Sequence, residues 1–224
     1  MLSFTEENYL KAIFKLSERE KKAASTNAIA KEMQTSAASV TDMLKRLAEK
    51  KLLNYEKYKG VTLSESGQKI ATNLIRKHRL WEVFLVEKLH FSWDEVHDIA
   101  EQLEHIHSEH LIDRLDEYLA FPKFDPHGDP IPDAEGKFTF RKQIPLSQLH
   151  VGRTAIVVGV QEHSAHFLQY LDRLDLGLGS QLEVLEKFDF DDSLRLDVNA
   201  TKEQIISIKV SQNLLVQEVD TRTS

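Results

Sequence analysis

The chain contains no cysteine among its 224 residues. Disulfide bonds, zinc–thiolate centres and thiol nucleophiles are therefore excluded, and the cytoplasm is the expected location. No apolar run is long enough to span a bilayer and the start shows no signal-peptide pattern, so we expect no membrane partner. Proline is scarce: there are five, and four fall within residues 121–138. This concentration predicts a linker there.

Charged residues and histidines are distributed unevenly along the chain. Residues 1–77 carry fifteen basic and nine acidic side chains, whereas residues 78–224 carry fourteen basic and twenty-seven acidic ones. All ten histidines lie at or after His78. A basic unit suits phosphate binding, and an acidic unit attracts cations. Nucleic-acid binding and metal binding are therefore expected in separate parts of the chain.

The first third of the chain has the pattern of a winged helix. Apolar spacing predicts a helix over 4–18, a short second helix, and a third helix that begins at the N-cap Ser36. Alternation over 53–58, the turn Lys59-Gly60 and the return over 61–63 predict a hairpin. Two short helices joined by a tight turn are typical of helix-turn-helix DNA-binding domains, and the hairpin matches a wing.

Polar and basic side chains on the third helix and the hairpin are the predicted DNA contacts. Short polar groups suit base or phosphate contacts, and the candidates are Ser36, Ser39, Thr41 and Asp42. Long cationic groups suit phosphates, and the candidates are Lys45, Arg46, Lys57 and Lys59. The alternative is a small helical domain whose basic residues are merely solvated.

Metal-binding side chains gather in the segment that follows. A helix is predicted from Trp93 to about Glu109, and at about 100° per residue four of its side chains share one quadrant: His97, Glu101, Glu104 and His105. On the preceding helix, predicted over 65–89, His78 and Glu82 lie one turn apart. Two imidazoles and two carboxylates on one face suit a divalent transition metal. The alternative is a solvated acidic face with incidental histidines.

The last third is predicted to be a small SH3-like β barrel. Strands are expected over 155–160, 181–188, 194–198, 205–210 and 214–219, with a short helix over 167–176. The predicted fold is multidomain, mainly α with a C-terminal β domain: a winged-helix domain (1–73), a helical metal-binding and dimerisation domain with the proline-rich linker (74–140), and the barrel (141–224). Surplus apolar residues in the middle helices predict a homodimer interface, among them Trp81, Val83, Val86 and Ile106.

These motifs together resemble the diphtheria-toxin-repressor family of iron- and manganese-dependent repressors. The resemblance rests on Glu7-Asn8-Tyr9-Leu10, Ser39-Val40-Thr41, Tyr55-Glu56-Lys57-Tyr58-Lys59-Gly60, Arg76-Lys77-His78-Arg79-Leu80-Trp81-Glu82, and Val96-His97-Asp98 with Glu101, Glu104 and His105. It implies a homodimeric winged-helix regulator and not an enzyme. Such a regulator would repress metal-uptake genes by binding operator DNA when it is loaded with divalent metal.

The resemblance also implies two metal sites per subunit. The first would use Asn8, Glu101, Glu104 and His105. The second would use His78, Glu82 and His97, completed from the C-terminal domain by His163 and His166. Oxygen-rich donors favour Mn(II), with Fe(II) as the alternative. Lys11 stands where some manganese sensors of the family place an acid.

Two other functions account for parts of the sequence. A winged-helix regulator that responds to an organic effector explains the N-terminal third but not the histidine–carboxylate groups. A di-metal carboxylate enzyme would use paired Glu-x-x-His motifs, but at Glu104-x-x-His107 the histidine lies off the predicted ligand face. Metal-dependent DNA binding separates the three, because only the metal sensor needs metal to bind DNA.

Overall fold

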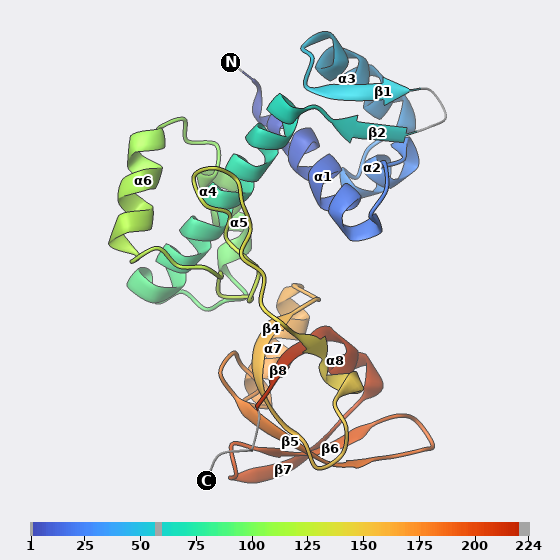
Figure 1. Ribbon diagram of the computed structural model, residues 1–224, viewed down its shortest axis with the longest axis vertical. Helices are drawn as coiled ribbons and strands as arrows, with labels where there is room; N and C mark the ends of the chain where they lie inside the picture. The colour runs from blue at the N-terminus through green and yellow to red at the C-terminus, as the bar shows by residue number, and fades with distance from the viewer. Residues whose placement is uncertain (1, 57–59, 220–224) are drawn as a thin grey trace. The chain divides into compact units, whose positions relative to one another are not determined.

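The structure is a computed structural model that describes residues 2–56 and 60–219. The chain forms two compact units, each built from three separate segments (Figure 1). The first comprises Met1–Trp81, Ala100–Arg114 and Ile131–Phe138, and the second comprises Glu82–Ile99, Leu115–Pro130 and Thr139–Ser224. None of the helices within the described residues combines the length and hydropathy needed to cross a bilayer.

The first unit begins with the winged helix that the sequence predicts. Its elements are α1 (Phe4–Glu20), α2 (Thr26–Glu32), α3 (Ala37–Glu49), β1 (Leu53–Glu56) and β2 (Gly60–Leu63). Ser3 and Glu6 form a reciprocal capping box at the start of α1, and the Ser36 hydroxyl caps α3 by accepting from the amide of Ser39. Apolar faces of the three helices meet in a shared core that includes Leu10, Ile13, Leu44 and Leu47, all fully buried.

Gly60 lets the hairpin pass close to the loop between α1 and α2. Its φ is +95°, and a Cβ there would lie 3.0 Å from the Ala23 Cβ and 3.1 Å from the Ala24 carbonyl oxygen. Ala24 forms an antiparallel bridge with Val61. A side chain at position 60 would therefore push the hairpin away from the helices that it packs against.

Three further helices follow the hairpin. Helix α4 (Glu65–Leu89) has the predicted bounds, and the others are α5 (Val96–Leu103) and α6 (Glu109–Tyr118). The prediction of one helix from Trp93 to about Glu109 is wrong at both ends. After α5 the amide of Ile106 bonds to the Leu103 carbonyl, and the Ser108 hydroxyl caps α6 instead. Consequently Glu104 and His105 lie in the turn after α5.

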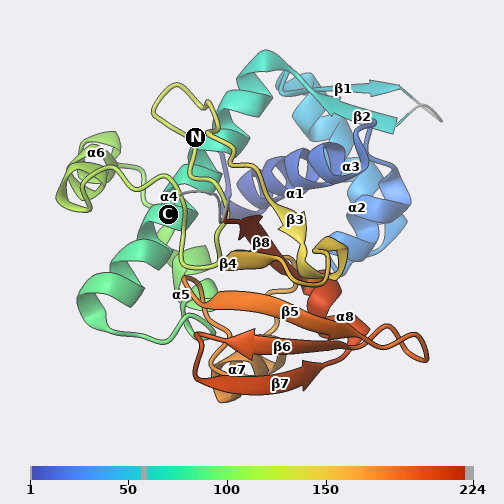
Figure 2. The same ribbon diagram turned by 60° about the horizontal axis from the view of Figure 1, so that its bottom comes forward.

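The second unit contains a six-stranded antiparallel sheet in the order β3-β8-β4-β5-β6-β7 (Figure 2). The strands are β3 (Ile144–Pro145), β4 (Thr154–Val160), β5 (Gln181–Lys187), β6 (Leu194–Val198), β7 (Lys202–Ile206) and β8 (Leu214–Glu218). The helices are η1 (Leu146–Gln148), α7 (Ala165–Arg173) and α8 (Ile208–Asn213). The predicted strand over 205–210 is confirmed only for its first two residues, which belong to β7, because the Ser207 hydroxyl caps α8 after them.

The barrel core is made by alternate residues of the strands. Leu182 and Val184 are buried, whereas Gln181 and Glu183 between them are exposed. Trp93, which precedes α5, packs against this core, and its indole N–H donates to the Asp172 carboxylate at 3.0 Å. The segment before α5 is therefore held by the β domain.

The proline-rich segment does more than link elements. Phe124 and Pro130 form an antiparallel bridge, which closes residues 124–130 into a compact loop. Gly128 has φ +89°, and a Cβ on it would lie 2.2 Å from the Val158 carbonyl oxygen on β4. Only glycine fits this close approach, so the loop is fixed against the sheet.

Candidate metal centres and DNA-binding surface

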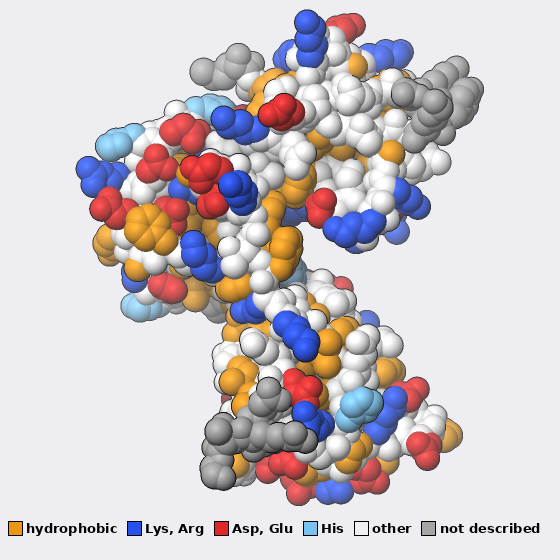
Figure 3. Space-filling view, in the orientation of Figure 1, with side chains coloured by type: hydrophobic (Ala, Val, Ile, Leu, Met, Phe, Trp, Pro, Cys, Tyr) orange, Lys and Arg blue, Asp and Glu red, His pale blue; other side chains and the backbone are white. Residues whose placement is uncertain are grey.

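The predicted DNA-contacting residues of α3 lie on its outer side. Ser36, Ser39, Asp42, Lys45 and Arg46 are exposed, and Thr41 is half-buried. The Thr41 hydroxyl donates to the Ala37 carbonyl at 2.8 Å, and Lys45 lies 3.6 Å from Asp42. Lys57 and Lys59 lie outside the described residues. The space-filling view shows Lys and Arg side chains exposed over α3 and at the end of α1 (Figure 3).

A cluster of charged side chains, all buried except the half-buried Glu101, lies in the first unit, and we call it the Lys11 cluster. Its members come from α1, α4, α5 and the turn after α5: Glu7, Lys11, His78, Glu101, Glu104 and His105. Glu104 is 0% exposed, and Lys11 and His78 are each 5% exposed. Charges buried to this degree are stable only when they are paired.

Lys11 stands at the centre of this cluster. Its Nζ lies 2.5 Å from Glu101 Oε1, and 2.6 Å and 2.8 Å from the two oxygens of Glu104. Burial raises the pKa of Glu101, but the Lys11 ammonium overcomes this effect and lowers the pKa below its ordinary value. Lys11 therefore neutralises the carboxylates that face it.

The two histidines of the Lys11 cluster are held by carboxylates as well. His78 Nδ1 lies 2.6 Å from Glu104 Oε2, and His105 Nδ1 lies 2.6 Å from Glu7 Oε2. The Phe4 ring stacks on His105 with ring centroids 4.4 Å apart. Each imidazole thus has a fixed orientation and an acidic partner.

The structure brings three of the four residues predicted for the first metal site into this cluster: Glu101, Glu104 and His105. The fourth, Asn8, has a buried Oδ1 with no hydrogen-bond partner among the described residues. His78, which we predicted for the second site, bonds to Glu104 here. The sequence analysis missed Glu7 as the partner of His105 and did not place Lys11 among the carboxylates. Glu7 and Lys11 are four residues apart on α1, and this i, i+4 spacing, which puts both side chains on one face of the helix, was the available signal.

A divalent ion does not fit the Lys11 cluster as it stands. The point that such an ion would share with the oxygens of Glu101 and Glu104 is occupied by the Lys11 nitrogen. An ammonium group has donors only, so it cannot itself serve as a ligand.

A second cluster lies in the second unit, and we call it the His127 cluster. It consists of Glu82 on α4 and of Asp125 and His127 on the loop 124–130, and all three are buried. One ligand atom from each lies within 4.8 Å of the others. Asp125 Oδ1 accepts from the amides of His127 and Asp129, at 2.9 Å and 3.0 Å, which holds the loop in shape.

The orientation of His127 suits it to ligation. Its Nε2 lies 2.8 Å from the Trp93 carbonyl oxygen and must therefore donate, while Nδ1 faces Glu82 Oε2 at 3.7 Å. Such a bond from the second ring nitrogen commonly orients a metal-binding imidazole. Burial lowers the pKa of His127, but Glu82 and Asp125 outweigh it and raise the pKa to about 9. The carboxylates thus create a field that attracts positive charge.

The residues predicted for the second site lie at different distances from the His127 cluster. Glu82 Oε1 lies 3.4 Å from His97 Nδ1, and the His163 ring stacks on His127 with centroids 5.0 Å apart. His166 is exposed. Asp125 and His127 were missed because they lie in the segment predicted as a linker. The spacing Asp125-x-His127-x-Asp129 was a signal that could have found them.

The His127 cluster fits a divalent metal. Two carboxylates and an imidazole, withdrawn from water and held by bonds to the backbone, are donors that Mn(II) and Fe(II) accept. His163 is a further donor close to this group, and burial lowers the pKa of its imidazole, which favours the neutral form that a metal requires.

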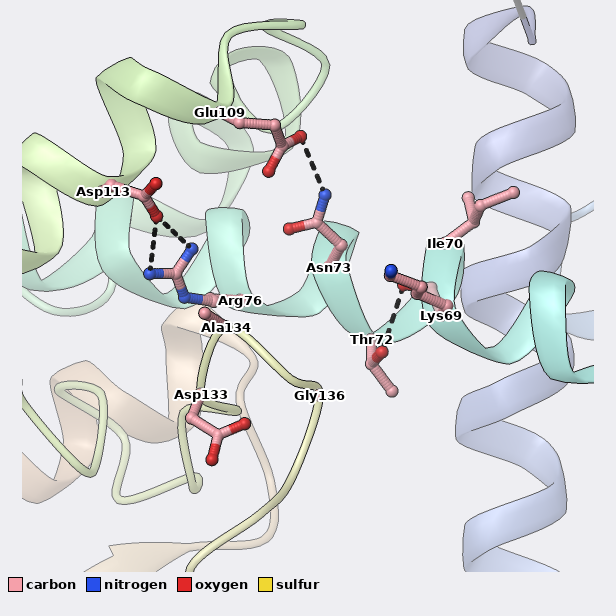
Figure 4. Close-up of a pocket in the computed structure, with 10 residues that line it drawn as sticks. All are labelled: Lys69, Ile70, Thr72, Asn73, Arg76, Glu109, Asp113, Asp133, Ala134 and Gly136. Carbon is pink, nitrogen blue, oxygen red and sulfur yellow. Dashed lines mark hydrogen bonds and ion pairs between the residues drawn. The ribbon is translucent and has the colours of Figure 1, made fainter.

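A cavity of about 440 Å³ in the first unit is separate from both clusters. It lies between α4, the start of α6 and residues 133–136 (Figure 4). Arg76 donates to Asp113 at 3.4 Å there, and Asn73 donates to Glu109 at 3.1 Å. These polar groups pair with each other, and the cavity has no lining residue from either cluster.

A winged helix together with buried carboxylate–imidazole clusters defines a class of protein, the DNA-binding regulators that carry their own metal-binding groups. Three family models match the chain. They describe the N-terminal DNA-binding domain of iron-dependent repressors (residues 1–61), the metal-binding and dimerisation domain of iron-dependent repressors (64–133), and the FeoA domain (144–218).

Individual relatives agree with these models. The iron-dependent repressor IdeR of Mycobacterium leprae is 31% identical over 179 residues, which cover 76% of this chain and 77% of that protein. The diphtheria toxin repressor of Corynebacterium jeikeium is 34% identical over 128 residues, or 57% of this chain and 53% of that protein. A solved manganese-dependent transcriptional repressor in complex with manganese has a TM-score of 0.86 and 33% identity, covering 95% of this chain and 99% of that one.

The chain belongs to the iron-dependent repressor family, whose members are DNA-binding transcriptional regulators and not enzymes. The prediction of family and of fold class is therefore confirmed, and the di-metal enzyme is set aside. The chain spans about half the length, or less, of several curated relatives that it matches.

Proposed function

We propose that this chain is a Mn(II)-responsive repressor that binds operator DNA as a homodimer, and that the His127 cluster is its metal-responsive site. The observation that carries the proposal is the burial of Glu82, Asp125 and His127 with their donor atoms within 4.8 Å of one another. A bound divalent cation would neutralise the two carboxylates and hold them together.

The chemistry of the donors favours manganese. Carboxylate oxygens are hard donors, and the chain has no cysteine to offer a soft thiolate. Fe(II) accepts the same donors and is the second candidate. The similarity to a manganese-dependent repressor supports the choice of Mn(II) over Fe(II).

The His127 cluster joins separate segments of the chain. Glu82 belongs to α4, and Asp125 and His127 belong to the loop 124–130. His127 also bonds to the Trp93 carbonyl before α5. Helix α4 begins at Glu65, just after the hairpin β1–β2. We therefore propose that fixing its second half selects the arrangement in which the α3 helices of two subunits fit successive major grooves.

Exposed apolar side chains of the second unit support a dimer. Phe91 is 38% exposed, Leu89 52%, Phe121 57% and Tyr118 65%. Large apolar groups left in water are typical of surfaces that a partner covers. Val83, which we predicted at this interface, is buried within the subunit.

DNA binding by the metal-stripped protein tests the proposal. Fluorescence anisotropy with genomic operator fragments would compare Mn(II), anaerobic Fe(II) and chelator. Mn(II) should induce tight binding, His127→Ala should abolish that response, and His150→Ala, a change at an exposed histidine, should preserve it. Binding that ignores the chelator would reject the metal mechanism and favour a regulator of organic-effector type.

A further inference from the structure

Lys11 occupies the place of an ion in the first of the two predicted metal sites. We propose that the Lys11 ammonium permanently replaces the metal in the Lys11 cluster, so that each subunit takes one metal ion, at the His127 cluster. The metal count rests on the proposed function of the His127 cluster, but the evidence for the replacement comes entirely from the Lys11 cluster.

The contacts of Lys11 use all the hydrogen-bond donors of its ammonium group. An ammonium group carries three N–H donors. Three carboxylate oxygens lie between 2.5 Å and 2.8 Å from Nζ, one from Glu101 and two from Glu104. The side chain is 7% exposed, so the ammonium cannot exchange these partners for water without leaving the interior.

The two imidazoles of the Lys11 cluster are also engaged. His105 directs Nδ1 to Glu7 at 2.6 Å, and His78 directs Nδ1 to Glu104 at 2.6 Å. A divalent ion entering beside Lys11 would meet a like charge within bonding distance of the same oxygens, and it would have to expel the ammonium first. The Lys11 cluster therefore ties α1 to the segment 101–105 whether or not metal is present.

Asn8, the fourth residue predicted for this site, does not bond to Lys11. Its Oδ1 is buried and has no hydrogen-bond partner among the described residues. If Lys11 lost its charge, the carboxylates of Glu101 and Glu104 would be left facing each other without a cation between them. Removal of the ammonium should therefore create a metal site that the natural sequence excludes.

Equilibrium dialysis of the full chain against Mn(II), with bound metal counted per subunit, tests the inference. The wild-type protein should bind one ion. Lys11→Met keeps the apolar stem of the side chain and removes its charge, and this variant should bind two. The double variant Lys11→Met, Glu104→Gln should return to one. Lys11→Arg and the surface control Lys22→Ala should stay at one.

The possible outcomes separate the two proposals. Two ions on the wild-type protein, reduced to one by Glu104→Gln, would overturn the replacement by Lys11. A count of one for Lys11→Met, with the variant shown to be folded by circular dichroism, would also overturn it. A count of zero on the wild-type protein, rising to one in Lys11→Met, would support the replacement by Lys11 and reject the His127 cluster as a metal site.

Discussion

The Lys11 cluster and the His127 cluster are built from similar carboxylates and imidazoles, but different cations face the carboxylates. In the first, a lysine nitrogen lies within 2.8 Å of three carboxylate oxygens. In the second, the cation facing Glu82 is the imidazolium of His127. An imidazole can release its proton and become a ligand, whereas an ammonium group has donors only and cannot be a ligand. On the proposed function, the identity of one basic residue decides whether an acidic cluster is structural or responds to metal.

The largest expected effect is the loss of stability from breaking the Lys11 cluster. Glu104→Ala would leave Lys11 buried without its main partner and should lower the free energy of unfolding by about 3–5 kcal/mol. Urea denaturation measures this loss, which should be the same with and without Mn(II). The exposed pair Glu18–Lys21 supplies the control, since Glu18→Ala should cost less than about 1 kcal/mol. A comparable small cost for Glu104→Ala would show that the cluster does not hold the first unit together.

A substitution at Gly128 should displace the loop of the His127 cluster without changing any of the proposed metal ligands. Gly128→Ala would force a Cβ against the Val158 carbonyl oxygen, 2.2 Å away, whereas Gly179 has a similar φ of +89° with no atom within 4 Å. Gly128→Ala should therefore cost about 1–3 kcal/mol more than Gly179→Ala in thermal unfolding. It should also weaken Mn(II) binding, while Gly179→Ala should not. Equal costs for the two variants would contradict the close packing of the loop.

Substitution of a proposed metal ligand in the His127 cluster should have the opposite effect to Glu104→Ala, with a small change in stability and a large change in metal affinity. Asp125→Asn keeps an oxygen that can accept the two backbone amides but removes one charge. Stability of the metal-free protein should change by less than about 1 kcal/mol, because no buried cation loses its only partner. Mn(II) affinity, measured by calorimetry, should fall at least about tenfold. A large loss of metal-free stability would mean that this cluster is structural too.

The smallest expected effect concerns the support behind His127. Trp93→Phe removes the indole donor to Asp172 but keeps the carbonyl that accepts from His127. It should cost about 0.5–1.5 kcal/mol in urea denaturation. Mn(II) affinity should change by less than about threefold, and a larger drop would show that the indole itself orients the site.

The sequence predicted the elements that depend on local signals. The capping serine Ser36 marked the start of α3, and the apolar period over 65–89 marked α4 with correct bounds. It failed where a cap interrupted the pattern: α5 ends at Leu103 and Ser108 caps α6 inside the predicted helix, while Ser207 caps α8 inside a predicted strand. A serine side chain that bonds to a nearby backbone amide can start a new helix even where the spacing of apolar residues predicts that the earlier element continues.

The two charged clusters were predicted only in part, for a different reason. Helical spacing put Glu101 and Glu104 on one side of a helix, but the cation that faces them comes from α1, ninety residues away along the chain. Asp125 and His127 lie in a proline-rich loop, where no helical or strand period relates them to Glu82. Contacts between distant segments are set by tertiary packing, which spacing within one segment does not encode.

A stoichiometric Mn(II) titration of operator binding tests the central claim most directly. With subunit concentration far above the dissociation constant for the metal, anisotropy of labelled operator DNA is followed as Mn(II) is added to the metal-stripped protein. If the His127 cluster alone responds, binding should rise linearly and reach its plateau at one equivalent per subunit. A plateau at two equivalents, or full binding before any metal is added, would contradict the account.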